Sequence, residues 1–130
     1  AVNDSFVRRY AADGVIVSTP TGSTAYSFSA GGPILMPTMD CFAVTPVCPY
    51  ASLSSAIVTS GSDCIRVTVH VPQPEPDAPP LLIIDSYEKY ALRDGDEIRL
   101  YKAPCTLRTV KTREWNFYAK LQQKLAENGQ

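Results

Sequence analysis

Residues 13–33 of this 130-residue chain read DGVIVSTPTGSTAYSFSAGGP, and this stretch sets the order of the first structural elements. The run Gly14–Val17 carries β-branched residues, which favour an extended strand. Residues Ala25–Ala30 can sustain about two helical turns, and Gly31-Gly32-Pro33 is a signal that ends a helix. The stretch therefore predicts a strand, a hydroxyl-rich turn and a short helix.

The turn between the predicted strand and helix has the composition of a polar binding element. Pro20 restricts the backbone, and we expect Gly22 to allow a conformation or a close approach that a Cβ would block. Ser23 or Thr24 is expected to cap the helix through its side-chain oxygen. A helix start presents unpaired N–H groups to polar and anionic ligands. In an arbitrary turn of this composition, however, the commoner role of the hydroxyl groups is to stabilise the backbone.

The order of the residues is more specific than their composition. The stretch Asp13–Ile34 closely resembles the signature of the NAD kinase family, over about twenty consecutive positions without a gap. Thr45–Pro49 resembles the TP-x-CP strand end of that family, and Asp94–Asp96 resembles a later acidic turn. Two positions depart from the family pattern. Tyr50 stands where the family commonly has histidine, and Ser55-Ala56 replaces an arginine-proline pair.

The resemblance covers only part of the family's architecture. NAD kinases have an N-terminal α/β domain with a Gly-Gly-Asp-Gly motif, whose aspartate is the family's expected catalytic base, and an Asn-Glu pair. Neither motif occurs in this sequence. The resemblance therefore implies that residues 1–130 form the C-terminal, NAD-binding domain, with no catalytic residue of their own.

The family reaction indicates what the complete protein does. It is the transfer of the γ-phosphoryl group of ATP to the 2′-hydroxyl of the adenosine ribose of NAD, which gives NADP. Such transfers use Mg²⁺ or another divalent cation to neutralise phosphate charge. The resemblance implies NAD and ATP as partners of the full-length protein, and we expect the isolated chain to be inactive.

Residues that bind NAD follow from the resemblance position by position. In the family, the segment that contains Tyr26 lines the NAD site, and the tyrosine packs against the dinucleotide through a flat ring with a polar tip. Cys48 matches a position beside the dinucleotide, and Asp85 matches an aspartate of a late strand. Asp13 matches an aspartate that reaches the ligand of a neighbouring subunit, so we expect a homo-oligomer. The predicted substrate-binding residues are Asp13, Thr21, Thr24, Ala25, Tyr26, Ser29, Cys48 and Asp85.

Other functions stay open on the sequence alone. One is a non-catalytic dinucleotide-binding or regulatory module, which the departures at Tyr50 and Ser55-Ala56 would allow. Another is a related lipid or small-molecule kinase domain, against which the string TPTGSTAY argues. A plain β-sandwich interaction module is the baseline, because a fold alone does not determine a function.

Composition favours one globular domain and excludes several classes of protein. Hydrophobic residues make up 45% of the chain, enough for a core, and the net charge of −1 leaves no basic stripe for nucleic acid. No apolar run approaches the roughly 20 residues that span a membrane, and the N-terminus lacks a secretory pattern. We expect an intracellular, cytoplasmic protein without nucleic-acid or membrane partners. An organellar address stays open, because we expect further sequence upstream of Ala1.

The metal-ligating residue types are few and scattered. The four cysteines, Cys41, Cys48, Cys64 and Cys105, include no CxxC pair, so we predict reduced and mostly buried thiols. His70 is the only histidine, and we expect its side chain to be exposed or hydrogen-bonded. The sequence therefore predicts no metal site.

Periodicity predicts a mainly β fold, a two-layer antiparallel β-sandwich-like domain with one short helix after the TPTGSTAY turn and one C-terminal helix. The expected strands are Ala1–Tyr10, Val15–Ser18, Cys41–Val47, Ala56–Val58, Cys64–Val71, Leu81–Asp85 and Glu97–Lys102, with Thr106–Val110 as a further candidate. A Pro-rich stretch, residues 72–80, contains five prolines and predicts an extended loop. Recognition of this loop by a proline-binding partner is the less favoured alternative.

The C-terminal helix is expected over Arg113–Glu127. Trp115, Tyr118, Leu121 and Leu125 share one face of it, and its aromatic residues resemble the family's C-terminal helix. One interpretation is that this face packs against the sandwich. The other is that it covers the N-terminal domain of the full-length protein, in which case the isolated chain would expose the face and self-associate.

Overall fold

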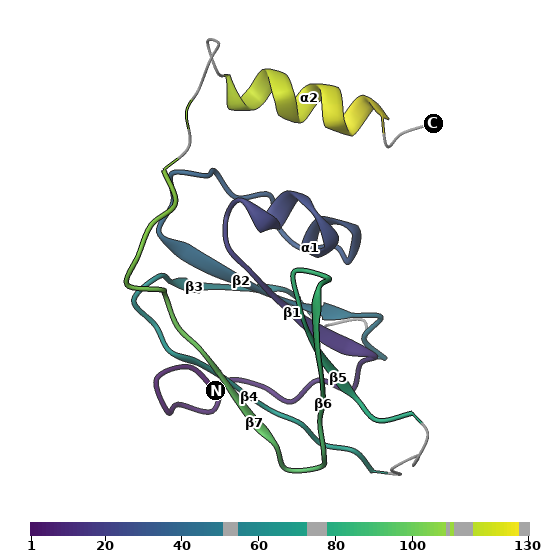
Figure 1. The fold of residues 1–130 in the computed structure, drawn as a ribbon. Coiled ribbons are helices and arrows are strands. Elements are labelled where there is room, and N and C mark those ends of the chain that lie inside the picture. The colour runs from purple at the N-terminus through teal and green to yellow at the C-terminus, as the bar shows by residue number, and fades with distance from the viewer. Residues whose placement is uncertain (51–54, 73–77, 109, 111–115, 128–130) are drawn as a thin grey trace.

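The computed structural model describes residues 1–50, 55–72, 78–108, 110 and 116–127, and antiparallel strands predominate among them (Figure 1). A three-stranded sheet has the order β1-β2-β3, and two pairs, β4-β7 and β5-β6, complete the strands. The strands are β1 (Gly14–Ser18), β2 (Cys41–Val47), β3 (Ile57–Ser60), β4 (Ile65–Thr68), β5 (Leu81–Ile84), β6 (Glu88–Ala91) and β7 (Glu97–Leu100). The helices are a 3₁₀ turn (Gly22–Thr24), α1 (Tyr26–Ser29) and α2 (Phe117–Glu127). The expected mainly β, antiparallel fold is confirmed.

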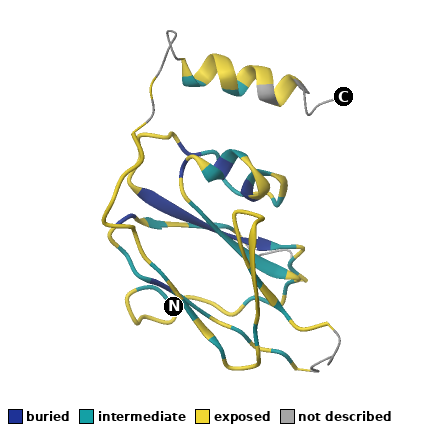
Figure 2. Ribbon diagram, viewed as in Figure 1, coloured by how far each residue is buried: buried dark blue, intermediate teal, exposed yellow. Residues whose placement is uncertain are grey.

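Strand β2 is the centre of the structure, and Figure 2 shows most of it in dark blue, as buried. Because side chains alternate along a strand, its residues divide between two layers. Phe42 and Val44 cluster with Ile65 of β4, which joins the three-stranded sheet to the β4-β7 pair. Cys41 and Ala43 point the other way and cluster with Leu35, under the helical segment. One core cluster therefore lies between the three-stranded sheet and the β4-β7 pair, and a second lies on the other face of β2, which a helical layer covers.

Two predicted strands are wrong. Within Ala1–Tyr10 only isolated bridges form, from Val2 to Ser5 and to Ile65. Asn3 and Asp4 have φ values of 46° and 65°, so the chain turns there instead of extending. The described residues of Thr106–Val110 are irregular and exposed.

Strand β6 was not predicted from the sequence. Each of its residues, Glu88 to Ala91, is exposed, so no alternation of apolar and polar residues marked it. It pairs with β5 across a turn in which Asp85 and Ser86 have φ values of 45° and 67°. Two consecutive positive φ values are typical of a type I′ hairpin turn, so local backbone geometry defines this strand.

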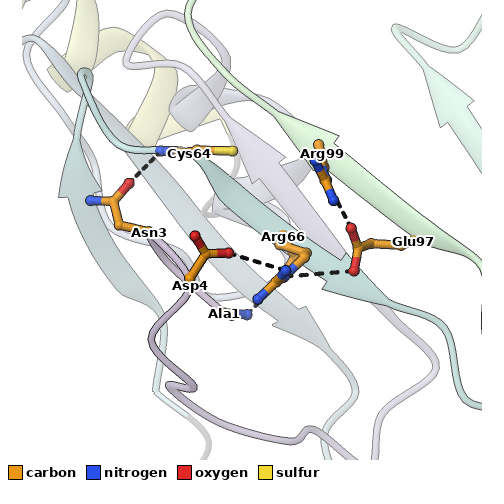
Figure 3. A network of polar contacts seen from close by, with 7 residues as sticks. All are labelled: Ala1, Asn3, Asp4, Cys64, Arg66, Glu97 and Arg99. Carbon is orange, nitrogen blue, oxygen red and sulfur yellow. Dashed lines mark hydrogen bonds and ion pairs between the residues drawn. The ribbon is translucent and has the colours of Figure 1, made fainter.

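The N-terminal segment is held by polar contacts to β4 and to Cys64 just before it (Figure 3). The backbone N–H of Asn3 donates to the Cys64 carbonyl at 3.0 Å, and the Cys64 N–H donates to Asn3 Oδ1 at 2.9 Å. Arg66 lies between Asp4 at 3.1 Å and Glu97 at 3.7 Å. Exposed ion pairs add little stability, so the paired Asn3–Cys64 bonds set the position of the segment.

The predicted helices are longer than the observed ones. Helix α1 has four residues, about one turn instead of the expected two. Helix α2 begins at Phe117, after Asn116, whose side-chain oxygen accepts from the N–H groups of Tyr118 (3.0 Å) and Ala119 (3.2 Å). Asn116 is therefore the N-cap. The predicted start at Arg113, and with it Trp115, lies outside the described residues.

The start of the Pro-rich stretch is anchored by the acidic turn between β6 and β7. Asp94 accepts the N–H of Val71 at 2.8 Å and lies 3.1 Å from Nδ1 of His70. The Val71 N–H, together with the nearby His70, lowers the pKa of Asp94. His70 is exposed and hydrogen-bonded, as expected. The middle of the stretch, residues 73–77, lies outside the described residues.

Replacement of Thr59 should stabilise the fold. Thr59 pairs with Phe42 on the face of the sheet that packs against Ile65, and its buried hydroxyl has no hydrogen-bond partner in the described parts of the chain. A buried hydroxyl without a partner is destabilising. We expect Thr59→Val to raise the free energy of unfolding by about 1 kcal/mol, measured by urea denaturation. Thr68→Val, at an exposed position of β4, is the control and should change little.

Candidate functional site

The hydroxyl-rich turn folds as a 3₁₀ turn followed by α1, and the side chains of this helical segment divide among three faces. Ser23 and Ser27 are four residues apart and face the sheet, with 0% and 1% exposure. Thr24 and Phe28 are also four residues apart, and both line an apolar depression beneath α2. Hydroxyl groups that are adjacent in the sequence therefore have different surroundings in the fold.

The third face of the helical segment is open to solvent. The ring of Tyr26 is 74% exposed. Around it lie other exposed residues of the predicted site, namely Thr21, Ala25 and Ser29. This surface offers a flat ring, a phenolic oxygen and aliphatic hydroxyl groups to a ligand that has both an aromatic part and polar edges.

The buried serines do not cap the helix, so the capping prediction is wrong. Ser23 Oγ donates to the Pro20 carbonyl at 2.7 Å and accepts from the Leu35 N–H at 3.1 Å. Thr24 Oγ1 turns back to the Thr21 carbonyl at 3.4 Å, and Ala25, the residue before α1, makes no side-chain cap bond. The side-chain oxygens of Ser23 and Thr24, which were expected to cap the helix, instead bond to backbone groups of the preceding turn and of the loop after α1.

A different glycine makes the close approach. A Cβ on Gly22 would lie 3.5 Å from Ser18 Cβ, an ordinary contact, so the expectation for Gly22 is wrong. A Cβ on Gly32 would lie 2.6 Å from Thr45 Oγ1 and 2.7 Å from the Ser27 carbonyl, which is too close for real atoms. Gly31 has a φ of +82° and ends α1, as predicted. The sequence marks the Gly-Gly pair as the end of the helix. Only the structure shows that Gly31 adopts the positive φ and that Gly32 makes the close contact.

Helix α2 packs on the helical layer, on the side of β2 away from the β4-β7 pair (Figure 1). Leu121 and Leu125 line the depression together with Thr24, Phe28 and Ile34. The hydroxyl of Tyr118 lies 3.6 Å from Met36 Sδ. Tyr118 stays 65% exposed and Leu125 44% exposed, so the face predicted from the sequence is only partly covered. The α2 helix therefore forms one side of the site, next to Thr24.

The predicted site residues do not all come together within one chain. Asp13 and Cys48 lie at one end of the β1-β2 pair, because Gly14 pairs with Val47, whereas the turn follows Ser18 at the other end. A strand of this length separates the two ends by about 13 Å. Cys48 is exposed, with a φ of 45°, and Asp85 lies in the β5-β6 hairpin turn. The structure groups Thr21, Thr24, Ala25, Tyr26 and Ser29.

Some supporting residues were not expected from the sequence. Thr45 of β2 is 1% exposed, and its Oγ1 lies 3.0 Å from Ser27 Oγ. The sequence marked Thr45 only as the first residue of the TP-x-CP pattern. Its contact with Ser27 could not be assigned before the strand register was known.

The described residues carry no metal cluster. Among them, no group of three or more His, Cys, Asp or Glu side chains is arranged to hold an ion. The four cysteines are free thiols, and Cys105 is exposed, so the prediction of burial is wrong for that residue. In the same part of the chain, no helix has the length and apolar character that a membrane span requires.

The chain is similar to known proteins over nearly its whole length. A family model described as the ATP-NAD kinase C-terminal domain matches residues 1–112. An NAD kinase of Symbiobacterium thermophilum is 43% identical over 126 residues, which cover 97% of this chain and 43% of that protein. A bifunctional NADP phosphatase/NAD kinase of Methanocaldococcus jannaschii is 43% identical over 95% of this chain and 20% of its own length. The chain thus spans less than half of these relatives.

Solved structures agree with the sequence matches. Yeast NADH kinase complexed with NADH superposes with a TM-score of 0.66 and 36% identity, over 75% of this chain and 27% of that one. An NAD kinase from Archaeoglobus fulgidus in complex with ATP has a TM-score of 0.69 and 33% identity, over 80% of this chain and 38% of that one. These matches agree with the signature around Tyr26 and with the antiparallel fold. The chain belongs to the ATP-NAD kinase family and matches its C-terminal domain.

Proposed function

We propose that this chain is the NAD-binding domain of an NAD kinase. The complete protein would transfer the γ-phosphoryl group of ATP to the 2′-hydroxyl of the adenosine ribose of NAD. The observation that carries the proposal is the exposed ring of Tyr26, on a short helical segment that Ser27 bonds to β2 and Ser23 bonds to the flanking loops. The names of the relatives support the reaction, and the NADH and ATP complexes of two similar proteins support the class of ligand.

The open face of the helical segment suits a dinucleotide. Tyr26 would pack against a ring of the ligand, while the hydroxyl group of Ser29 on this face, and that of Thr24 at its border with α2, would bond the polar edges of the ligand. Thr24 lies at the boundary with α2, so that helix would border the bound ligand. The chain would position the nucleophile, and the base would come from the remainder of the enzyme.

A divalent cation would accompany ATP and neutralise phosphate charge during transfer. Among the described residues, no group of three or more His, Cys, Asp or Glu side chains is arranged to hold this cation. ATP and the cation would be held by the rest of the enzyme, and we place the complete protein in the cytoplasm.

The separation of Asp13 and Cys48 from the turn supports a homo-oligomer. Asp13 is exposed and lies at the end of β1 opposite to the turn that carries Tyr26. In an oligomer, this end of one copy would meet the ligand held by the turn of another. Asp85, in its own hairpin, is the weakest member of the proposed site.

A test of the proposed function is ATP-dependent formation of NADP by the full-length protein that carries this chain. We expect NADP to form, and we expect Thr24→Val to lower kcat/KM for NAD about tenfold, because one hydrogen bond to the ligand is lost. Thr68→Val is the matched control, because Thr68 is exposed on β4, which belongs to a different sheet from the strand β1 that leads into the turn. A protein that binds NAD by calorimetry but forms no NADP would instead be a non-catalytic dinucleotide-binding module. No NADP and no binding would overturn the proposal.

A further inference from the structure

A pair of buried hydroxyl groups joins the helical segment to the central strand. Ser27 Oγ and Thr45 Oγ1 are 3.0 Å apart, and the two residues are 1% exposed. The backbone of Gly32 packs against both side chains, and its N–H donates to the Ser27 carbonyl at 2.8 Å. Ser27 is thus held at its side chain by β2 and at its backbone by the loop that follows α1.

Helix α1 needs such external bonds to keep its orientation. One turn of helix is not stable by itself, because nucleation fixes several dihedral angles for one hydrogen bond. Tyr26, adjacent to Ser27, has too exposed a ring for packing to fix its direction. An apolar contact would let α1 slide or rotate on the sheet, whereas a hydrogen bond depends on both distance and angle.

We propose that Thr45 is a positioning residue of the dinucleotide site, acting through Ser27 to orient Tyr26 and Ser29. This inference rests on the proposed function. Thr45 does not touch the ligand: it lies on the inner side of α1, opposite to the open face. Its bond to Ser27 preorganises the open face, so that the cost of ordering the site is met on folding and not on binding.

Three variants of the full-length protein separate positioning from stability. Thr45→Val keeps the shape of the side chain but leaves Ser27 Oγ buried without its partner. It should weaken NAD binding and raise KM for NAD, each about tenfold, and lower the unfolding midpoint. Thr45→Ser retains the hydroxyl and should restore binding. The double variant Ser27→Ala/Thr45→Val removes both hydroxyl groups of the pair, so neither is left buried without the other, and its unfolding midpoint should return toward wild type while NAD binding stays about tenfold weaker.

Thr59→Val is the matched control, because it makes the same substitution on the neighbouring strand, on the opposite face of the sheet. It should leave NAD binding unchanged. Wild-type affinity in Thr45→Val, or in the double variant, would overturn the positioning role and leave the proposed function intact. So would failure of Thr45→Ser to restore binding. A wild-type protein that neither binds NAD nor forms NADP would overturn both.

Discussion

Gly32→Ala is expected to lower the free energy of unfolding by about 3 kcal/mol, the largest loss of stability we predict for a substitution of one small residue. The added Cβ would lie 2.6 Å from Thr45 Oγ1 and 2.7 Å from the Ser27 carbonyl, and it would also overlap Ser27 Oγ. A carbonyl of the backbone cannot move aside like the end of a long side chain. The loop must therefore lift away from β2, which also breaks the Ser27–Thr45 bond. Urea denaturation of the chain would measure the change.

Gly31→Ala, one residue earlier, is the control for this prediction. Gly31 has a φ of +82°, but a Cβ there would meet no atom within 4 Å. Its substitution carries only the conformational cost of about 1 kcal/mol. If the two alanine variants were equally stable, the close packing around Gly32 would not be what holds the helical segment to the sheet.

Tyr26→Ala should weaken NAD binding by about 100-fold in the full-length protein while changing stability little. Stacking of one base on an aromatic side chain contributes on the order of 1–3 kcal/mol to binding, and the upper part of that range corresponds to this factor. The ring is 74% exposed, so the free protein gains little from its packing. Isothermal calorimetry with NAD measures the affinity, and thermal denaturation measures the stability. Tyr26→Phe should retain most of the binding, because it keeps the ring.

Tyr87→Ala is the matched control, because Tyr87 is 91% exposed and lies beside the β5-β6 turn. It should bind NAD like wild type. Equal losses at Tyr26 and Tyr87 would mean that removal of an exposed aromatic surface, and not a specific stack, changes affinity. Unchanged binding in Tyr26→Ala would remove the central residue from the proposed site.

Much of the fold could be predicted because its signals are local. The β-branched residues of β1 and β2 favour strands, and the nearly continuous apolar run of β2 fits a strand buried on both sides. Where local signals misled, a competing contact or backbone angle explains the error. Asn3 and Asp4 turn the N-terminal segment through positive φ values. The β6 strand depends on its hairpin and carries no apolar face of its own.

The site shows the same division in finer detail. The string TPTGSTAY was enough to propose a dinucleotide site at Tyr26, since the order of its residues is specific. It could not reveal that Ser23 and Ser27 face the sheet, because their partners, Leu35 and Thr45, are 12 and 18 residues away. Nor could it tell Gly22, with ordinary space around it, from the tightly packed Gly32.

The sequence by itself thus determined the family, the antiparallel β character and the segment that carries the proposed ligand site, since these depend on residue order and local conformational preference. Only the tertiary structure decided which hydroxyl groups face a ligand and which are buried, and that Asp13 lies at the opposite end of β1 from Tyr26. Those properties depend on strand register and on contacts between distant residues. A hydroxyl side chain of the helical segment can hydrogen-bond within the protein or bind a ligand, and which of the two it does depends on the residues that surround it in space.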